Sequence, residues 1–306
     1  MRSKSAQIIT IRSVSAFDTG PSRTALVTAV ARDLHREEPP PLVLDDTLAL
    51  QLAGKEGLAL RDRLRAELRY DDLLAFSRWV CVRSRYAEDI VEQQAGTGVG
   101  QYVILGAGLD TFAYRHPDPG LRVFEVDHPA TQAWKQRRLA SLGVAIPGNL
   151  VFVPVDFERQ GLGPALEEAG CTFAEPAVFS WLGVTMYLTS DAIDQTLSAI
   201  ARGAAGTRVV LTYNQPDHVL DNHAVRVTSA MRSIAAGFGE PFVTLFTRDE
   251  IDAVLREHEF DVIEHIGRDE ARTRYFGGRR DVEIAGAQAL VSATVRASSA
   301  ISQTDS

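Results

Sequence analysis

Along the chain, short apolar runs alternate with longer segments in which apolar residues recur every three or four positions. The short runs are rich in β-branched and aromatic residues, as strands buried on both faces are. They predict seven strands, at residues 102–105, 122–126, 151–155, 177–182, 208–213, 260–265 and 288–296. Helical patterns are expected between them at 128–142, 163–169, 190–201 and 248–257. Strands separated by helices favour right-handed crossovers and a mainly parallel sheet.

The first hundred residues have a different pattern, which predicts helices. One helix is expected after Pro21, and it ends before three consecutive prolines because proline cannot continue a helix. An extended entry then leads to a short helix with Asp45 or Asp46 as its cap. This segment, with its short helix, lies at residues 42–53. Two further helices are expected at 58–75 and 76–94.

These patterns divide the chain of 306 residues into three parts. Residues 1–100 are expected to form a helical cover, and their first twenty are polar and irregular. Residues 101–296 form an α/β core, and residues 297–306 form a serine-rich, loose tail. Because no linker-like segment separates the first two parts, we expect the helices to cover the core rather than to form a separate module.

The stretch from residue 101 to residue 129 has the pattern of a nucleoside-binding turn. Gly106 and Gly108 directly follow an apolar strand, and glycine lets the backbone turn sharply and approach a ligand closely. Asp127 ends the next strand, about 20 residues further on, where an acidic side chain can hold a ribose diol. Two alternatives stay open: a tight turn in a protein that binds its ligand elsewhere, and Asp127 as a helix cap.

The glycine spacing also indicates the kind of nucleoside. A dinucleotide fingerprint has a third glycine three residues after the second, and Thr111 stands at that position. The pattern therefore favours a ligand without phosphates, such as S-adenosylmethionine. An NAD-dependent oxidoreductase and a non-catalytic binding protein of the same fold remain the alternatives.

Further candidates lie near the carboxyl ends of the other strands, where open parallel sheets bind their ligands. Asp156 could accept a hydrogen bond from an adenine amino group, and Phe157 could flank the ring. Arg83 and Arg85 precede the first strand and could hold the carboxylate of a methionine moiety through forked hydrogen bonds. A solvated helix face explains the two arginines equally well.

Methyl transfer to an oxygen depends mainly on positioning the acceptor and excluding water. A carboxylate is already ionised at neutral pH, whereas a phenol, with a pKa near 10, benefits from a base. The candidates for the acceptor site follow the fifth strand and include Tyr213, Asn214, His218 and His223. We select Tyr213 and His218 as the catalytic pair, although His218 is also compatible with an ordinary surface histidine.

Composition and charge limit the kinds of molecule that the protein is expected to bind. The net charge is −8 and no long basic run is present, which argues against nucleic acid. The sequence has neither an apolar run that could span a bilayer nor a signal-peptide block at its start. Cys81 and Cys171 form neither a disulfide framework nor a metal cluster. We expect a cytoplasmic enzyme with no metal that acts on a small molecule, and homo-oligomer formation stays open.

Several linked motifs resemble one family. They are RSRYAEDIVEQQ, QYVILGAGLDTFAYR, VFEVDHPATQAWKQRR, VPVDFE and SWLGVTMYLT. Together they are similar to the leucine carboxyl methyltransferase-like family of S-adenosylmethionine-dependent enzymes, in particular to its bacterial polyketide O-methyltransferase branch of the tetracenomycin carboxyl-methylating type. The resemblance extends from about residue 22 to about residue 278. It implies a class I methyltransferase fold: an α/β, Rossmann-like, seven-stranded, mainly parallel sheet with a final antiparallel strand and an N-terminal helical cover.

The resemblance also implies roles for individual residues. Arg83 would bind the methionine carboxylate, and Gly106 and Gly108 would form the cofactor loop. Asp127 would hold the ribose, and the Asp156–Phe157 pair would bind the adenine. Protein-methylating members carry a glutamate after the fourth strand, where this chain has Leu182. That departure favours a small, polyketide-like acceptor that is methylated on a carboxylate or hydroxyl oxygen.

Overall fold

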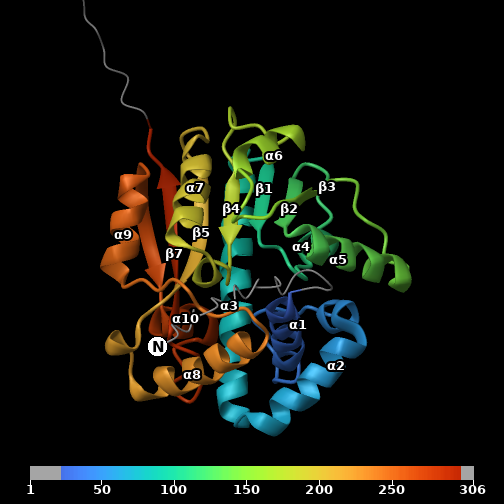
Figure 1. Ribbon diagram of the computed structural model, residues 1–306, viewed down its shortest axis with the longest axis vertical. Coiled ribbons are helices and arrows are strands. Elements are labelled where there is room, and N and C mark those ends of the chain that lie inside the picture. The colour runs from blue at the N-terminus through green and yellow to red at the C-terminus, as the bar shows by residue number, and fades with distance from the viewer. Residues whose placement is uncertain (1–21, 298–306) are drawn as a thin grey trace, which may run out of the picture.

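A seven-stranded sheet carries the fold (Figure 1). The structure is a computed structural model that describes residues 22–297. The strand order is β3-β2-β1-β4-β5-β7-β6. The strands are β1 (Gln101–Leu105), β2 (Arg122–Asp127), β3 (Leu150–Pro154), β4 (Val178–Trp181), β5 (Arg208–Asn214), β6 (Phe260–Ile266) and β7 (Gln288–Val295). The predictions for residues 1–20 and for the tail beyond residue 297 lie outside the described residues.

All seven predicted strands are present, and the expected class I methyltransferase topology is confirmed. The five strands from β1 to β5 pair in parallel, so their carboxyl ends meet at one edge of the sheet. The last strand, β7, runs antiparallel between β5 and β6 and faces β5 residue by residue from Arg208–Thr294 to Asn214–Gln288. The parallel edge is where ligands bind in such sheets.

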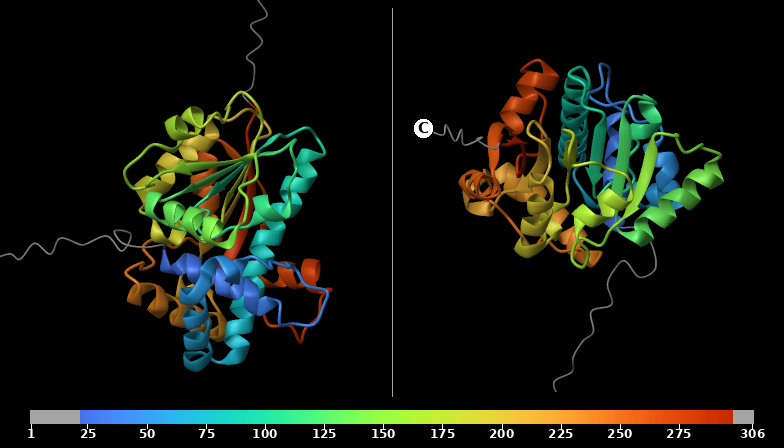
Figure 2. Two further views of the ribbon diagram at one scale, coloured as in Figure 1. Left: turned by 90° about the vertical axis from the view of Figure 1, so that its right-hand side faces the viewer. Right: turned by 90° about the horizontal axis from the view of Figure 1, so that it is seen from above.

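Helices cover both faces of the sheet (Figure 2). Alternate strand residues point to opposite faces, so Val103 and Leu105 join one core cluster while Tyr102 and Ile104 join another. The first cluster includes α6 (Leu162–Glu168), α7 (Ser190–Ala201) and α9 (Arg248–Glu257). The second includes α3 (Tyr70–Ala95), α4 (Phe112–Arg115) and α10 (Arg268–Phe276). The helix α5 (Pro129–Leu142) packs against β3 and α2.

The remaining helices lie beyond the carboxyl edge of the parallel strands (Figure 1). They are α1 (Arg23–His35), α2 (Ala49–Glu67) and α8 (Asn222–Gly237). The first two pack on each other and on α3, with their own small apolar core. The segment before β1 is therefore helical, as predicted. Because α3 also covers the sheet, the division of the chain into a cover and a core at residue 100 stays a prediction. No helix in residues 22–297 is long and apolar enough to cross a bilayer.

The helix boundaries agree with the sequence in part. Thr247 caps α9 in a capping box with Glu250, as expected. Asp46, rather than Asp45, accepts hydrogen bonds from the backbone at the start of α2. The prediction of one continuous helix at 58–75 is wrong. Leu68 adopts an extended backbone that ends α2 at Glu67, and α3 begins at Tyr70. The charged helix α10 was not predicted.

Candidate active site

A cavity of about 340 Å³ lies at the carboxyl ends of the parallel strands, between the sheet and the cover. Its walls combine strand ends, α1, α3, α8 and the segment that follows α8. The predicted cofactor residues that line it are Arg83, Gly106, Gly108, Asp127, Asp156 and Phe157. The fold thus brings together all six residues, although they come from widely separated parts of the chain.

The glycine turn after β1 fits closely between its neighbours. Gly106 has a φ of 66°, and a Cβ there would lie 2.3 Å from Cγ2 of Val184. Gly108 has a φ of 52°, and its Cβ would lie 3.0 Å from that of Ala25. The amides of Gly106 and Ala107 both donate to the carbonyl of Val126 on β2. Glycine is therefore required here for the backbone conformation as well as for space.

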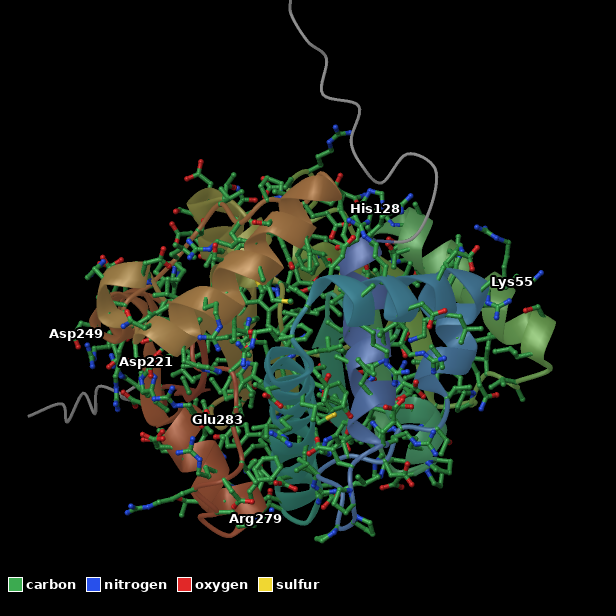
Figure 3. All side chains as sticks on the ribbon, turned by 90° about the horizontal axis from the view of Figure 1, so that it is seen from below. Lys55, His128, Asp221, Asp249, Arg279 and Glu283 are labelled. Atoms are coloured by element: carbon green, nitrogen blue, oxygen red, sulfur yellow. The ribbon has the colours of Figure 1, made fainter. Side chains whose placement is uncertain are left out.

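Asp127, at the end of β2, faces this turn. One carboxylate oxygen accepts the amide of Gly108, and the other accepts the amide of His128 at 2.6 Å. Burial raises the pKa of Asp127, whereas the two amides lower it. The helix cap of α5 is His128, which lies beside the start of α1 (Figure 3). Because each carboxylate oxygen has a second lone pair, Asp127 can still accept hydrogen bonds from a diol.

Arg83 brings a buried positive charge to the cavity from α3. Its Nη1 donates to Oε1 of Gln288 at 2.9 Å, and no carboxylate among residues 22–297 forms an ion pair with it. Burial lowers its pKa to about 10. The guanidinium lies against Gly183, where a Cβ would come within 2.5 Å of Nη1. Arg85 instead pairs with Asp89 at 2.6 Å. A buried cation without a counter-charge fits an incoming carboxylate.

Asp156 and Phe157 follow β3 and also line the cavity. The carboxylate of Asp156 accepts the amide of Glu158 at 3.1 Å and lies 3.6 Å from Nε of Arg159. The ring of Phe157 lies 6.3 Å from that of Trp181, in a tilted arrangement. The pair therefore offers a hydrogen-bond acceptor beside an aromatic face.

The structure places the predicted catalytic pair elsewhere. Tyr213 is buried on the opposite side of β5 from the cavity, and its hydroxyl lies 3.1 Å from Nδ1 of His265. His218 is exposed on a short 3-10 helix (Asp217–Val219). Neither residue lines the cavity, so its geometry gives no support to a catalytic role for either. Of the four candidates after the fifth strand, Asn214 alone lines it.

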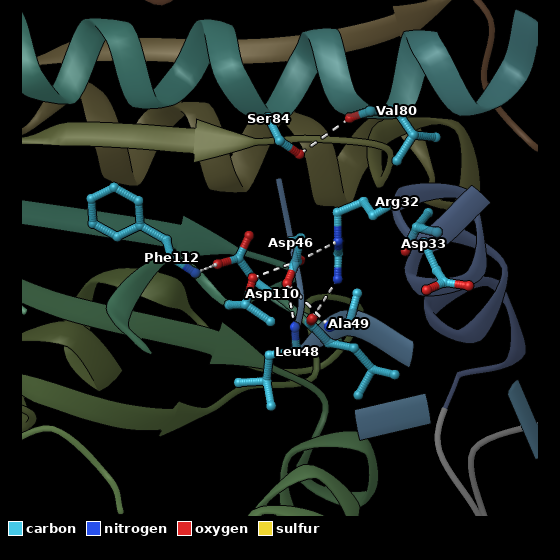
Figure 4. A network of polar contacts seen from close by, with 12 residues as sticks. Arg32, Asp33, Asp46, Leu48, Ala49, Val80, Ser84, Asp110 and Phe112 are labelled. Carbon is cyan, nitrogen blue, oxygen red and sulfur yellow. Dashed lines mark hydrogen bonds and ion pairs between the residues drawn. The ribbon is translucent and has the colours of Figure 1, made fainter. Parts of the chain in front are cut away.

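A buried polar network fixes the cover to the glycine turn (Figure 4). Arg32 on α1 lies 2.8 Å from the carboxylate of Asp46 and donates to the carbonyl of Leu109 at 2.6 Å. The Nε–H bond of Arg32 is not aligned with that carboxylate, so the contact is an ion pair rather than a hydrogen bond. Thr111, the residue that replaces the third glycine, donates to Asp46 at 2.7 Å. Burial would raise the pKa of Asp46, but Arg32 and Thr111 hold it below its usual value.

The remaining wall of the cavity is mostly apolar. It comes from α3, α8, the segment after α8 and the segment before β7, and includes Phe76, Val227, Met231, Ile234, Phe242 and Ala285. One carboxylate, that of Glu240, faces this part of the cavity. It accepts the amide of Arg23 at 2.9 Å and the hydroxyl of Ser22 at 3.0 Å, so it caps the N-terminus of α1. Nothing in the local sequence around Glu240 predicts this contact.

Neither cysteine takes part in this site, because Cys81 and Cys171 are buried free thiols outside the cavity lining. In the part of the chain that the structure describes, no group of three or more His, Cys, Asp or Glu side chains is arranged to hold a metal ion. The lining of the cavity includes the glycine turn, the strand-end carboxylates, Arg83 and the apolar wall.

Comparisons with known proteins show the family to which the chain belongs. The family model of leucine carboxyl methyltransferases matches residues 25–201, more than half of the chain. The protein YktD of Bacillus subtilis, whose given name is that of an S-adenosyl-L-methionine-dependent methyltransferase, is 32% identical over 284 residues. That match covers 85% of this chain and 93% of YktD. A protein of Mycobacteroides abscessus with a name of the same kind is 31% identical over 222 residues, which are 71% of this chain and 72% of that protein.

Among solved structures, a DUF574 family protein from Streptomyces avermitilis has a similar fold. Its TM-score is 0.59, with 14% sequence identity, and the match covers 92% of this chain and all of that one. The likeness concerns the fold, and the sequence matches carry the family assignment. The chain therefore belongs to the leucine carboxyl methyltransferase family and is an S-adenosylmethionine-dependent methyltransferase.

Proposed function

We propose that the protein transfers a methyl group to a carboxylate or hydroxyl oxygen of a small, largely apolar acceptor of the polyketide type. The observation that carries the proposal is the composition of the cavity. One end presents the glycine turn, the strand-end carboxylates and a buried arginine, and the other end is lined by apolar side chains of α3 and α8. A polar cofactor and an apolar acceptor can thus lie next to each other inside one cavity of about 340 Å³.

The residues at the polar end match the parts of S-adenosylmethionine. Arg83 would hold the methionine carboxylate, because its buried charge has no carboxylate partner among residues 22–297. Asp127 would accept hydrogen bonds from the ribose, and Asp156 from the adenine amino group, with Phe157 beside the ring. The bound cofactor supplies a methyl group on a sulfonium, and the protein's task is to exclude water and to align the acceptor oxygen.

The apolar end offers little help to an acceptor that must lose a proton. Glu240 is engaged by the N-terminus of α1. Burial and the nearby Glu240 raise the pKa of Tyr187, so its hydroxyl stays protonated. A carboxylate acceptor needs no base, because it is ionised at neutral pH. Leu182, which lines the cavity where protein-methylating relatives carry a glutamate, is consistent with a small acceptor.

The first test is calorimetric titration of the purified protein with S-adenosylhomocysteine, with NAD as the parallel control. We expect binding of S-adenosylhomocysteine and no heat from NAD. The complex with S-adenosylmethionine is then incubated with aromatic carboxylic acids and phenols, and the products are identified by mass spectrometry. A product heavier by one methyl group would support the proposal. Binding of NAD alone, or cofactor binding with methylation of a nitrogen acceptor only, would overturn it.

A further inference from the structure

Four buried polar side chains form a row beside the cavity. Trp79 and Arg83 lie one turn apart on α3, and both donate to Oε1 of Gln288, at 2.8 and 2.9 Å. Gln288, on β7, donates through Nε2 to Oδ1 of Asn214 at 2.7 Å. Asn214 and Gln288 face each other across the β5–β7 ladder. Each of the four side chains is at least nine-tenths buried, and all four line the cavity.

The chemistry of this row fixes the orientation of both amides. The indole of Trp79 and the guanidinium of Arg83 can only donate hydrogen bonds. The Gln288 atom that they contact must therefore be its oxygen, and its NH2 group must point to Asn214. Asn214 in turn must present its oxygen to Gln288, which leaves its own NH2 group on the other side. The hydrogen-bonding chemistry of the row thus sets the direction of the Asn214 amide.

The NH2 group of Asn214 has no hydrogen-bond partner among residues 22–297, although the residue is only 5% exposed and lies on the cavity wall. Nδ2 is not among the fully buried side-chain atoms that lack a partner, so it is open to the cavity, where a bound molecule can accept its hydrogen bond. Resting on the proposed function, we propose that Asn214 binds the acceptor, donating a hydrogen bond from Nδ2 to an oxygen of that molecule. Gln288 is the positioning residue that turns the amide toward it.

The location supports an acceptor contact. Asn214 ends β5, the neighbour of β4, and Arg83 lies against Gly183 just after β4. Since Arg83 is the group suited to the methionine carboxylate, the row connects the cofactor end of the cavity to Asn214 through one glutamine. Arg83 therefore has two roles. It can bind the cofactor, and it holds Gln288 in the orientation that directs the NH2 group of Asn214 into the cavity.

A crystal structure of the protein with S-adenosylhomocysteine and benzoate tests the contact directly. We expect Nδ2 of Asn214 to face the cavity and to contact a benzoate oxygen or, where benzoate is absent, an ordered water. Contact of Nδ2 with the carboxylate of S-adenosylhomocysteine would overturn the proposal. So would an inverted amide that turns Oδ1 to the cavity, or a protein group bonded to Nδ2. This crystal structure tests the contact even if the protein methylates no acceptor. Failure to methylate any acceptor would count against the proposed function and not against this contact.

Kinetics with the best acceptor from the screen give the second readout. Asn214→Leu removes the donor, whereas Asn214→Asp keeps the acceptor for Gln288 and replaces only the NH2 group. We expect the KM for a carboxylate acceptor to rise about tenfold or more in Asn214→Leu, with the KM for S-adenosylmethionine within about twofold of wild type. Asn214→Asp should be worse still, because it sets two negative charges against each other. An unchanged acceptor KM in both variants would overturn the assignment.

The neighbouring Gln215 offers a matched control. Its amide lies one residue further along the chain and outside the cavity lining, with a long contact of 3.5 Å to the carbonyl of Gly286. Gln215→Leu should leave both KM values unchanged. If Gln215→Leu raises the acceptor KM as much as Asn214→Leu does, the effect comes from the packing of the segment, and the proposed hydrogen bond is refuted.

Discussion

Asp46 provides a sharp test of how the cover is held on the core. Its carboxylate is fully buried, lies 2.8 Å from Nε of Arg32, and accepts hydrogen bonds from Thr111 and from the amides of Leu48 and Ala49. Asp46→Asn keeps the size of the side chain but removes the negative charge. The guanidinium of Arg32, 7% exposed, then has no counter-charge. Breaking a buried pair in this way costs about 3–5 kcal/mol, a large share of the 5–15 kcal/mol typical of a native protein.

Urea unfolding at pH 7 measures this loss, and a double-mutant cycle identifies its source. Arg32→Met alone leaves the charge of Asp46 buried, whereas the double variant Arg32→Met/Asp46→Asn removes both charges. We therefore expect the double variant to lose much less stability than the sum of the two single losses. A single variant within about 1 kcal/mol of wild type, well below the figure for a broken buried pair, would refute the reasoning. Additive losses in the cycle would refute it as well.

Three further predictions concern the site and its surroundings. Gly106→Ala should lower stability by about 1–3 kcal/mol in thermal unfolding and weaken S-adenosylhomocysteine binding, because its Cβ would meet Val184 at 2.3 Å and its φ is positive; an unchanged melting temperature would contradict this. Asp127→Ala should weaken S-adenosylmethionine binding by about 1–3 kcal/mol, and equal affinity in a folded variant would disprove the ribose contact. Burial lowers the pKa of His265 below 6.5 although Asp252 raises it, so its contribution to stability is complete above pH 6.5 and is lost as the pH falls. Stability measured between pH 7.5 and pH 5 should therefore fall more steeply in wild type than in His265→Gln, and parallel curves would show that His265 is not the cause.

The sequence alone is sufficient to predict the seven strands of the sheet. The seven apolar runs, the separating helices and the acidic strand end are local patterns, and each corresponds to an element of the structure. The glycine turn was recognised because only glycine tolerates that backbone without strain. The sequence hides the boundary between α2 and α3 because Leu60, Leu64 and Leu68 recur every four residues and so continue the helical pattern through the residue at which α2 ends.

The residues on the proposed acceptor side of the cavity cannot be predicted from such local patterns. Position after a strand does not say which face a side chain occupies, and Tyr213 and Asn214 point to opposite faces because they are neighbours in one strand. The strand also runs one residue beyond its predicted end, which moves Asn214 into the ladder opposite Gln288. Glu240 and Gln288 reach the cavity through contacts with residues about 200 positions away in the sequence. No local pattern encodes such contacts.

The two ends of the cavity share α3 but otherwise come from different parts of the chain, so substitutions at the two ends meet different constraints. The residues proposed to hold the cofactor lie near strand ends and on α3, where backbone ladders and buried contacts constrain substitutions. Much of the apolar wall comes from α8 and the segment after it, and their contacts with α1 include Glu240 and the packing of Ile234 and Phe238. On the proposed function, side-chain volumes along α8 shape the acceptor end of the cavity, apart from the residues that would hold the cofactor. The same proposal makes α8 the helix at which redesign of acceptor selectivity should begin.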